Sequence, residues 1–297
     1  MIVQAENLHK AFRNHDALRG LSFAVPEGSA YALIGANGAG KTTTIKVLMN
    51  LVEASAGTAT VLGIDSRKLS SNEFAQIGYV SENQELPGRL SVGQYLDYLR
   101  PFYSDWDRSL EQSLLRELRL PLGRKIRELS HGMRLKMALA CALPFRPKLL
   151  VLDEPFSGLD SLVRDEFMER LLHQAGEMTI LISSHELAEI EGVVTDIAFL
   201  DEGQLLFQES MAELSERVRE VRITFDTEPA IPRPAPEGWI QMTVAGNVLS
   251  FVDTQFNDNR LADIAAARFK GIRHIDVQPI ALRSIFTTLA KAARDGG

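Results

Sequence analysis

One glycine-rich stretch decides the fold of this chain, and it runs Gly35-Ala36-Asn37-Gly38-Ala39-Gly40-Lys41-Thr42-Thr43. Its spacing matches the phosphate-binding loop pattern GxxxxGK(S/T). The apolar run Tyr31–Ile34 comes directly before it and is typical of a buried strand. After it, Ile45, Leu48 and Met49 recur at the i, i+3, i+4 spacing of a buried helix face. The sequence therefore predicts a strand, a tight glycine turn and a helix, in that order.

The chemistry of this loop suits a nucleoside triphosphate. Glycines let the backbone turn tightly and present successive N–H groups to phosphate oxygens, and the start of the helix adds its positive dipole end. Lys41 would reach the β- and γ-phosphates, and the Thr42 hydroxyl would ligate Mg²⁺. The plainer alternative is a glycine-rich turn without a ligand, which the flanking strand and helix disfavour. We assign nucleotide contacts to Gly35, Asn37, Gly38, Ala39, Gly40, Lys41, Thr42 and Thr43.

Two adjacent acids follow a second apolar run. Leu149–Leu152 leads directly into Asp153 and Glu154, so both carboxylates fall at the carboxyl end of a predicted strand, where open α/β sheets bind ligands. Asp153 suits the Mg²⁺ shell, and Glu154 suits the activation of a water molecule for phosphoryl transfer. Without the glycine-rich loop upstream, a solvated acidic pair would be the default interpretation. With the loop, we favour the catalytic one.

A histidine follows a third apolar run. His185 comes after Thr179–Ile182 and two serines, which places it at the end of a neighbouring strand. There it would donate to the γ-phosphate or orient the attacking water. The alternative, an ordinary hydrogen-bonded histidine, carries equal weight on spacing alone.

The wider pattern predicts an α/β fold with a mostly parallel sheet, because short apolar runs alternate with helical stretches. Leu149–Leu152 and Thr179–Ile182 are continuous runs, as expected of strands covered on both faces. Leu21–Val25 and Thr58–Leu62 predict a flanking antiparallel β layer. Between about residues 86 and 145 helical periodicity takes over, so we expect a helical insertion there.

A domain boundary is expected near residue 209. A hairpin, Ile197–Leu200 with Gln204–Phe207, would close an ATPase-like domain of residues 1–209. Four prolines then fall within residues 229–236, which predicts a stiff extended segment. We therefore expect residues 210–297 to form a small α+β appendage. Its predicted strands are Val218–Phe225, Trp239–Val252 and Ile275–Val277, and its predicted helices are Arg260–Lys270 and Ala281–Ala293.

The composition excludes several classes of protein. The chain has 297 residues, of which 45% are hydrophobic and 24% charged, the proportions of an ordinary globular protein. Its formal net charge of -7 argues against binding to nucleic acid, which is itself negatively charged. The single cysteine, Cys141, rules out an internal disulfide framework. No apolar run approaches the ~18 residues of a membrane span, so we expect an intracellular chain that does not cross a membrane.

Further motifs resemble those of the nucleotide-binding subunits of ABC transporters. The pentapeptide LSHGM at residues 129–133 resembles the signature motif, commonly LSGGQ, and residues 157–160 (SGLD) match the D-loop. His185 lies where the family has its switch histidine, and Ile77–Glu82 resembles the segment leading to the Q-loop. Phe12 stands where the family has an aromatic residue that stacks on adenine. The resemblance covers about residues 1–207, with all motifs in the family order.

This resemblance implies an ATP hydrolase that works as a homodimer, or as a heterodimer with a close relative. Each ATP, with its Mg²⁺, would lie between the glycine-rich loop of one subunit and the signature of the other. Ser130 and Gly132 would act in trans and Asp160 would contribute from the D-loop, while Glu154 and His185 would serve catalysis. The resemblance also implies a separate transmembrane permease as partner, a peripheral place on the inner face of the cell membrane, and export as the direction of transport.

Three positions depart from the family pattern. His131 and Met133 replace the usual second glycine and the glutamine of the signature, and Glu82 replaces the glutamine of the Q-loop. Two consequences of Glu82 stay open: a carboxylate would ligate Mg²⁺ more strongly than an amide, or it would alter the coupling of hydrolysis to the permease.

Two rival functions remain at this level. A soluble ABC protein of translation or DNA repair usually carries two such domains or long coiled-coil insertions, neither of which the sequence shows. A nucleotide sensor that does not hydrolyse ATP is disfavoured by Glu154 and His185. The appendage faintly resembles the tails of bacterial drug- or polyketide-export ATPases, and we expect it to be a spacer or dimer contact rather than a regulatory domain.

Overall fold

The computed structural model describes residues 1–82, 84–157, 159, 161–174, 178–186, 189–190 and 192–280. It divides into two compact units, Met1–Gln208 and Glu209–Gly297, which we describe separately. None of the helices formed by the described residues is long and apolar enough to cross a bilayer.

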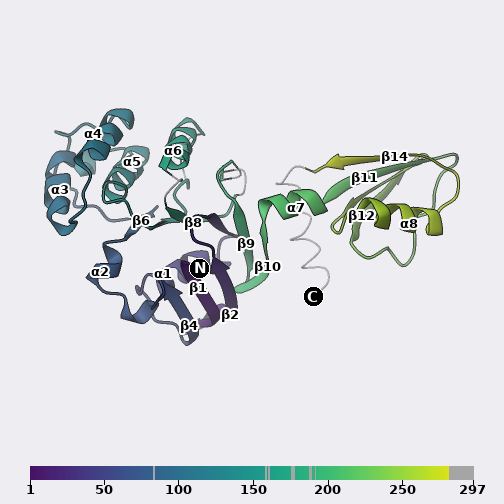
Figure 1. Cartoon of the computed structure of the whole chain (residues 1–297), viewed down its shortest axis with the longest axis horizontal. Coiled ribbons are helices and arrows are strands. Elements are labelled where there is room, and N and C mark those ends of the chain that lie inside the picture. Colours follow the sequence, from purple (N-terminus) through teal and green to yellow (C-terminus); the bar gives the residue numbers. More distant parts are fainter. Residues whose placement is uncertain are drawn as a thin grey trace. The chain divides into compact units, whose positions relative to one another are not determined.

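A six-stranded sheet forms the centre of the first unit (Figure 1). Its order is β10 (Gln204–Ser210), β9 (Asp196–Asp201), β3 (Ala30–Ile34), β8 (Thr179–Ser184), β7 (Leu149–Asp153) and β6 (Ile77–Ser81). The pairs β9–β3, β3–β8, β8–β7 and β7–β6 are parallel, as the sequence predicts. Every residue of β3, β7 and β8 is buried, which explains their unbroken apolar runs. The carboxyl ends of these three strands therefore lie side by side.

The predicted antiparallel layer is also present. It has the order β2 (His15–Val25), β1 (Val3–Phe12), β4 (Ala56–Val61) and β5 (Ile64–Asp65). Helix α1 (Lys41–Leu48) buries Ile45 and Leu48 in the core cluster that includes residues of both this layer and the central sheet. The cluster fixes the start of α1 relative to β3, and so holds the glycine-rich loop between them.

The predicted insertion between residues 86 and 145 is helical. It contains α3 (Val92–Leu99), α4 (Arg108–Glu117) and α5 (His131–Ala142), which Figure 1 shows grouped together. Ser91 caps α3 in a capping box, Asp107 caps α4 and Ser130 caps α5. Other helices of this unit are α2 (Ser71–Phe74), α6 (Ser161–Gln174) and the 3-10 turns at Ser66–Lys68, Arg100–Phe102 and Ile126–Glu128.

The second unit is an antiparallel sheet covered by a helix. In its described residues, up to residue 280, the strands are β12 (Trp239–Ala245), β13 (Val248–Asp253), β11 (Arg219–Phe225) and β14 (Ile272–Pro279), in that spatial order, and the helices are α7 (Met211–Arg217) and α8 (Asp258–Arg268). Val221, Ile223 and Phe225 alternate along β11 and pack into one core with Phe251 and with Leu261 of α8.

Two details of this unit differ from the predictions. The run Trp239–Val252 is a hairpin, not one strand, because Ala245 pairs with Val248 and leaves a two-residue turn. Gly246 in that turn has a φ of 60°, which glycine adopts without strain. Helix α7 was not predicted, and the predicted helix Ala281–Ala293 lies outside the described residues.

Candidate functional site

The glycine-rich loop needs its glycines for close packing. A Cβ on Gly35 would lie 2.2 Å from the carbonyl oxygen of Leu200 at the end of β9. Gly40 has a φ of 103°, and a Cβ there would lie 2.8 Å from the oxygen of Ala17. Gly203, in the β9–β10 turn, supports the same loop, because its N–H donates to the oxygen of Ala39 over 3.1 Å. The loop is therefore supported by both sheets of the first unit.

The start of α1 is open to an anion. Gly40 is its N-cap, and no side chain of the described residues caps it. The first N–H groups of a helix have no partner within the helix, so they point at whatever lies beyond its start. Together with the helix dipole, this arrangement favours a phosphate group.

Lys41 is held beneath the loop. Its Nζ donates to the oxygens of Gly35 over 2.7 Å and Ala36 over 3.1 Å. It also forms an ion pair with Glu154 Oε1 at 3.0 Å, and the Lys41 side chain is only 4% exposed. The charge is thus buried and paired, at the point where the sequence analysis places the terminal phosphates.

Asp153 lies beside Thr42. The Thr42 hydroxyl donates to Asp153 Oδ1 over 2.9 Å, and the Ser183 hydroxyl donates to the same oxygen over 2.8 Å. Burial raises the pKa of the Asp153 carboxyl and the nearby Glu154 charge raises it further, while the two hydroxyl hydrogen bonds act in the opposite direction. Ser183 was not singled out from the sequence, and the available signal was its place two residues before His185 on a buried strand.

The donor set of Thr42 and Asp153 fits Mg²⁺. A hydroxyl and a carboxylate are hard oxygen ligands, and Mg²⁺ in nucleotide sites is bound by one or two such groups together with phosphate and water. Within the described residues there is no cluster of three His, Cys, Asp or Glu side chains that would hold a metal by themselves. An ion at this site would therefore depend on the nucleotide for part of its shell.

Glu154 connects Lys41 to His185. Its backbone has a φ of 49°, in the left-handed region, and its N–H donates to the Ser183 hydroxyl over 2.9 Å. The Nδ1 of His185 donates to Glu154 Oε2 over 2.8 Å, since an ionised carboxylate only accepts. This hydrogen bond raises the pKa of His185, and partial burial opposes the effect.

A cavity of about 410 Å³ opens beside these groups. Phe12 borders it from the end of β1; its ring is 48% exposed and lies 5.0 Å from the Nζ of Lys10. The rest of the lining comes from the start of β2, the glycine-rich loop, the start of α1 and two acids: His15, Ala17, Asn37, Gly38, Gly40, Lys41, Thr42, Thr43, Glu82 and Glu154. Most of the predicted nucleotide contacts thus face one space.

The signature residues lie elsewhere. Ser130 caps α5 by accepting from the N–H of Met133, and neither Ser130 nor Gly132 lines the cavity beside Lys41. His131 contacts the oxygen of Ser157 through its Nε2 at 3.2 Å, which ties the start of α5 to the segment after Glu154. Asp160 and Gly158 lie outside the described residues.

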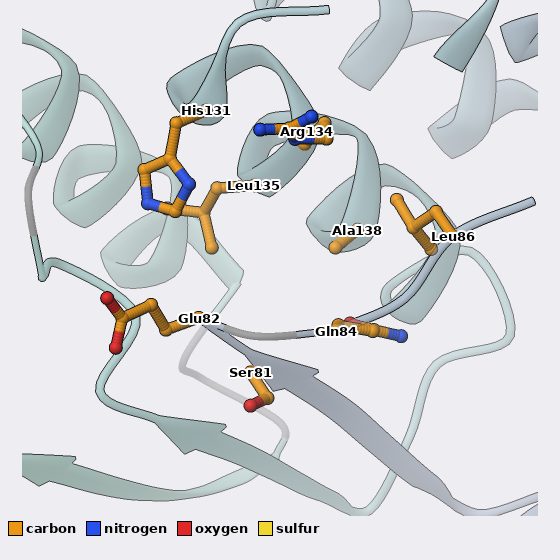
Figure 2. A pocket seen from close by; sticks show the side chains of 8 residues that line it. All are labelled: Ser81, Glu82, Gln84, Leu86, His131, Arg134, Leu135 and Ala138. Carbon is orange, nitrogen blue, oxygen red and sulfur yellow. The ribbon is translucent and has the colours of Figure 1, made fainter. Parts of the chain in front are cut away.

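Glu82 borders two spaces. Its N–H donates to the oxygen of Asp153 over 3.1 Å, and its side chain lines the cavity beside Lys41. It also lines a second cavity, where Figure 2 shows residues of α5, among them His131 and Arg134, on one wall and Ser81, Glu82 and Gln84 on the other. Glu82, the departure at the Q-loop, and His131, one of the two departures at the signature, therefore line the same cavity.

The chain was compared with known proteins. A family model described as ABC transporter matches residues 18–157. The ABC transporter ATP-binding protein YtrB of Bacillus subtilis is 28% identical over 229 residues, which cover 76% of this chain and 78% of that protein. The bacitracin transport ATP-binding protein BcrA of Enterococcus faecalis is 30% identical over 73% of this chain and 72% of its own length. The lantibiotic transport ATP-binding protein SrtF of Streptococcus pyogenes is 32% identical over 70% and 90%.

Solved structures agree with this fold. The structure of an ATP-binding subunit of an ABC transporter superposes with a TM-score of 0.66 at 29% identity, and covers 73% of this chain and 92% of that one. A dimeric ATP-binding cassette in a post-hydrolysis state with ADP and phosphate gives a TM-score of 0.60 at 22% identity, over 70% and 98%.

Proposed function

On the premise that this chain belongs to the ABC transporter family as an ATP-binding subunit, we propose the roles of its individual residues and of its metal. The chain hydrolyses ATP, dimerises with another ATPase subunit and drives a separate permease. The observation that carries the assignment of roles is a local one. Thr42 contacts Asp153 and Lys41 contacts Glu154, so two direct contacts join the start of α1 to the end of β7 beside one cavity.

The phosphates are bound by the start of α1. The loop N–H groups and Lys41 contact the β- and γ-phosphates, and Lys41 exchanges its contact with Glu154 for one with phosphate. Thr42 and Asp153 would hold Mg²⁺, since their oxygens lie 2.9 Å apart. When bound, the ion would supply neutralisation of the phosphate charge.

Glu154 accepts the proton of the attacking water. His185 contacts the Glu154 carboxylate over 2.8 Å through Nδ1, and we assign its other ring nitrogen to the γ-phosphate. Once Lys41 binds phosphate, Glu154 is free to act as a base. Phosphoryl transfer needs positioning and charge stabilisation more than covalent help, which suits this arrangement.

The remaining contacts are to the base and from the second subunit. The exposed ring of Phe12 stacks on adenine at the edge of the cavity. Ser130 and Gly132, at the start of α5, contact the ATP of the partner subunit, together with Asp160. Glu82 contributes a further oxygen near the metal.

We place the subunit on the inner face of the cell membrane, with export as its direction. The names of BcrA and SrtF, which refer to bacitracin and lantibiotic transport, support export of a similar kind. The second unit, residues 209–297, is a spacer or dimer contact.

A phosphate-release assay on purified variants tests these roles. Lys41→Ala should abolish turnover, whereas Lys68→Ala, which removes an exposed lysine, should leave it at the wild-type rate. Glu154→Gln should bind ATP but stall before hydrolysis and elute as an ATP-trapped dimer on gel filtration. Wild-type turnover in Lys41→Ala or Glu154→Gln would remove that residue from the scheme.

A further inference from the structure

We propose that Ser183 is a positioning residue that holds the two carboxylates of the hydrolytic site, Asp153 and Glu154, in their working arrangement. The proposal rests on the proposed function, because it takes Asp153 as the metal ligand and Glu154 as the base. Ser183 itself touches neither nucleotide nor metal in this scheme. It acts through the two acids.

The Ser183 hydroxyl contacts both of these residues. Its single proton goes to Asp153 Oδ1 over 2.8 Å, and its oxygen accepts the N–H of Glu154 over 2.9 Å. A serine hydroxyl has one donor and two acceptor positions, so one group spans both neighbours. Ser183 is 0% exposed, and water cannot replace either contact without rearrangement of the sheet.

The sheet fixes where this hydroxyl points. Ser183 lies directly opposite Asp153 in the β7–β8 register and opposite Leu33 in the β3–β8 register. The neighbouring strands on both sides therefore hold its backbone by hydrogen bonds. Because the serine side chain is short, its hydroxyl has little freedom to move away from Asp153.

Glu154 depends on this contact more than an ordinary residue would. A φ of 49° is unfavourable for a residue with a side chain, so the surroundings must hold it there. The N–H of Glu154 donates to Ser183, and its carboxylate contacts Lys41 and His185. Loss of the Ser183 hydroxyl leaves the Glu154 N–H without its acceptor and lets the turn relax.

The neighbouring hydroxyls of β8 serve other partners. Thr179 accepts the N–H of Gly28 over 2.8 Å at the opposite end of the strand. Ser184 donates to Glu189 Oε2 over 2.6 Å. Ser183 thus differs from the other two hydroxyls of the strand in that it contacts the acids of the site. Thr179 provides a matched control, because Thr179→Val also removes a buried hydroxyl and leaves a backbone N–H unpaired.

The test measures nucleotide affinity and turnover in the full chain. A fluorescent ATP analogue is titrated with Mg²⁺ and again with EDTA, and the ratio of the two dissociation constants gives the gain in affinity from the metal. In Ser183→Ala, that gain should fall roughly tenfold or more and kcat should fall by about 10–100-fold, as for other groups that orient metal ligands. The affinity in EDTA and the KM for ATP should stay within about threefold. Ser183→Thr, which keeps the hydroxyl, should recover most of the loss.

The control separates positioning from stability. Thr179→Val should lower Tm yet keep the wild-type metal gain and kcat. If Ser183→Ala does not fold, Ser183→Cys carries the same test, since a thiol of similar size is a weak donor. Ser183→Ala or Ser183→Cys with the metal gain and kcat of Thr179→Val would overturn the proposal, as would equal losses of affinity with and without Mg²⁺. Asp153→Asn decides whether the proposed function stands: if it keeps the metal gain, the metal assignment itself is wrong, whatever Ser183 does.

Discussion

Replacement of Glu154 by glutamine should tighten nucleotide binding in addition to stalling hydrolysis. Lys41 Nζ contacts Glu154 Oε1 at 3.0 Å, besides two loop carbonyls. Lys41 can contact a phosphate only after its ion pair with Glu154 has broken. Glutamine keeps an oxygen of the same shape but carries no charge, so the release of Lys41 becomes easier.

The size of the effect follows from the strength of this contact. A hydrogen bond that involves a charged group contributes about 1.5–3 kcal/mol. Lys41 keeps its charge in the variant, so its bond to glutamine falls at the lower end of this range and its ion pair with Glu154 at the upper end. The side chains are only 4% and 14% exposed, so solvent screening leaves most of the difference intact. A gain of about 1–1.4 kcal/mol corresponds to roughly five- to tenfold tighter binding. Removal of a negative charge beside the phosphates acts in the same direction.

The measurement needs conditions that exclude both metal and dimer closure. A fluorescent ADP analogue is titrated in EDTA, at a protein concentration where the chain elutes as a monomer. His185→Ala is the control, because it removes the other side-chain partner of Glu154 and leaves the Lys41–Glu154 pair in place. Its affinity should stay within about twofold of wild type. Equal or weaker binding by Glu154→Gln, or equal tightening by His185→Ala, would refute the reasoning.

Three other expectations can be checked on single variants. Phe12→Ala should weaken the binding of adenine nucleotides by about 5–150-fold, the range of one lost aromatic–base stack, while Phe12→Tyr should not; equal affinities in isothermal titration would contradict the role of the ring. Gly35→Ala should lower Tm and abolish nucleotide binding because its Cβ meets the oxygen of Leu200, whereas Gly123→Ala, with open space around it, should behave as wild type in the same two assays. The Glu154 contact raises the pKa of His185, so the stability that His185 contributes is fully present below the unfolded histidine pKa of about 6.5 and is lost as the pH rises through the raised value. The Tm difference between wild type and His185→Ala should therefore shrink from about pH 6 to pH 9, and a constant difference would argue against the contact.

The sequence predicted the strands whose residues are all buried. Leu149–Leu152 and Thr179–Ile182 are covered on both faces, so their apolar runs were unambiguous and both are strands. The strands of the second unit were harder to predict. The hairpin Trp239–Asp253 reverses direction at the two residues Gly-Asn, which lie within a run of strand-forming residues. Helix α7 has only seven residues, too few for a clear period.

The candidate site was predictable to the extent that it follows local patterns. Lys41 and Thr42 belong to a contiguous motif, and Asp153 and Glu154 follow a strand directly. The role of Ser183 could not be predicted in this way, because it depends on which strand pairs with β7. Local sequence patterns do not determine the order of strands in a sheet. The ion pair between Lys41 and Glu154 likewise joins residues more than a hundred positions apart, and only the folded chain brings them together.

The support that Gly203 gives to the loop affects how this protein is to be truncated. Every motif shared with the family ends by His185, yet the N–H of Gly203 is bonded to Ala39 and its oxygen accepts the N–H of Arg19 over 2.8 Å. A fragment that ends after the last motif would keep every residue assigned to ATP binding. It would lose Leu200, whose carbonyl oxygen packs against Gly35. The shortest autonomous nucleotide-binding fragment therefore has to extend through the turn between β9 and β10.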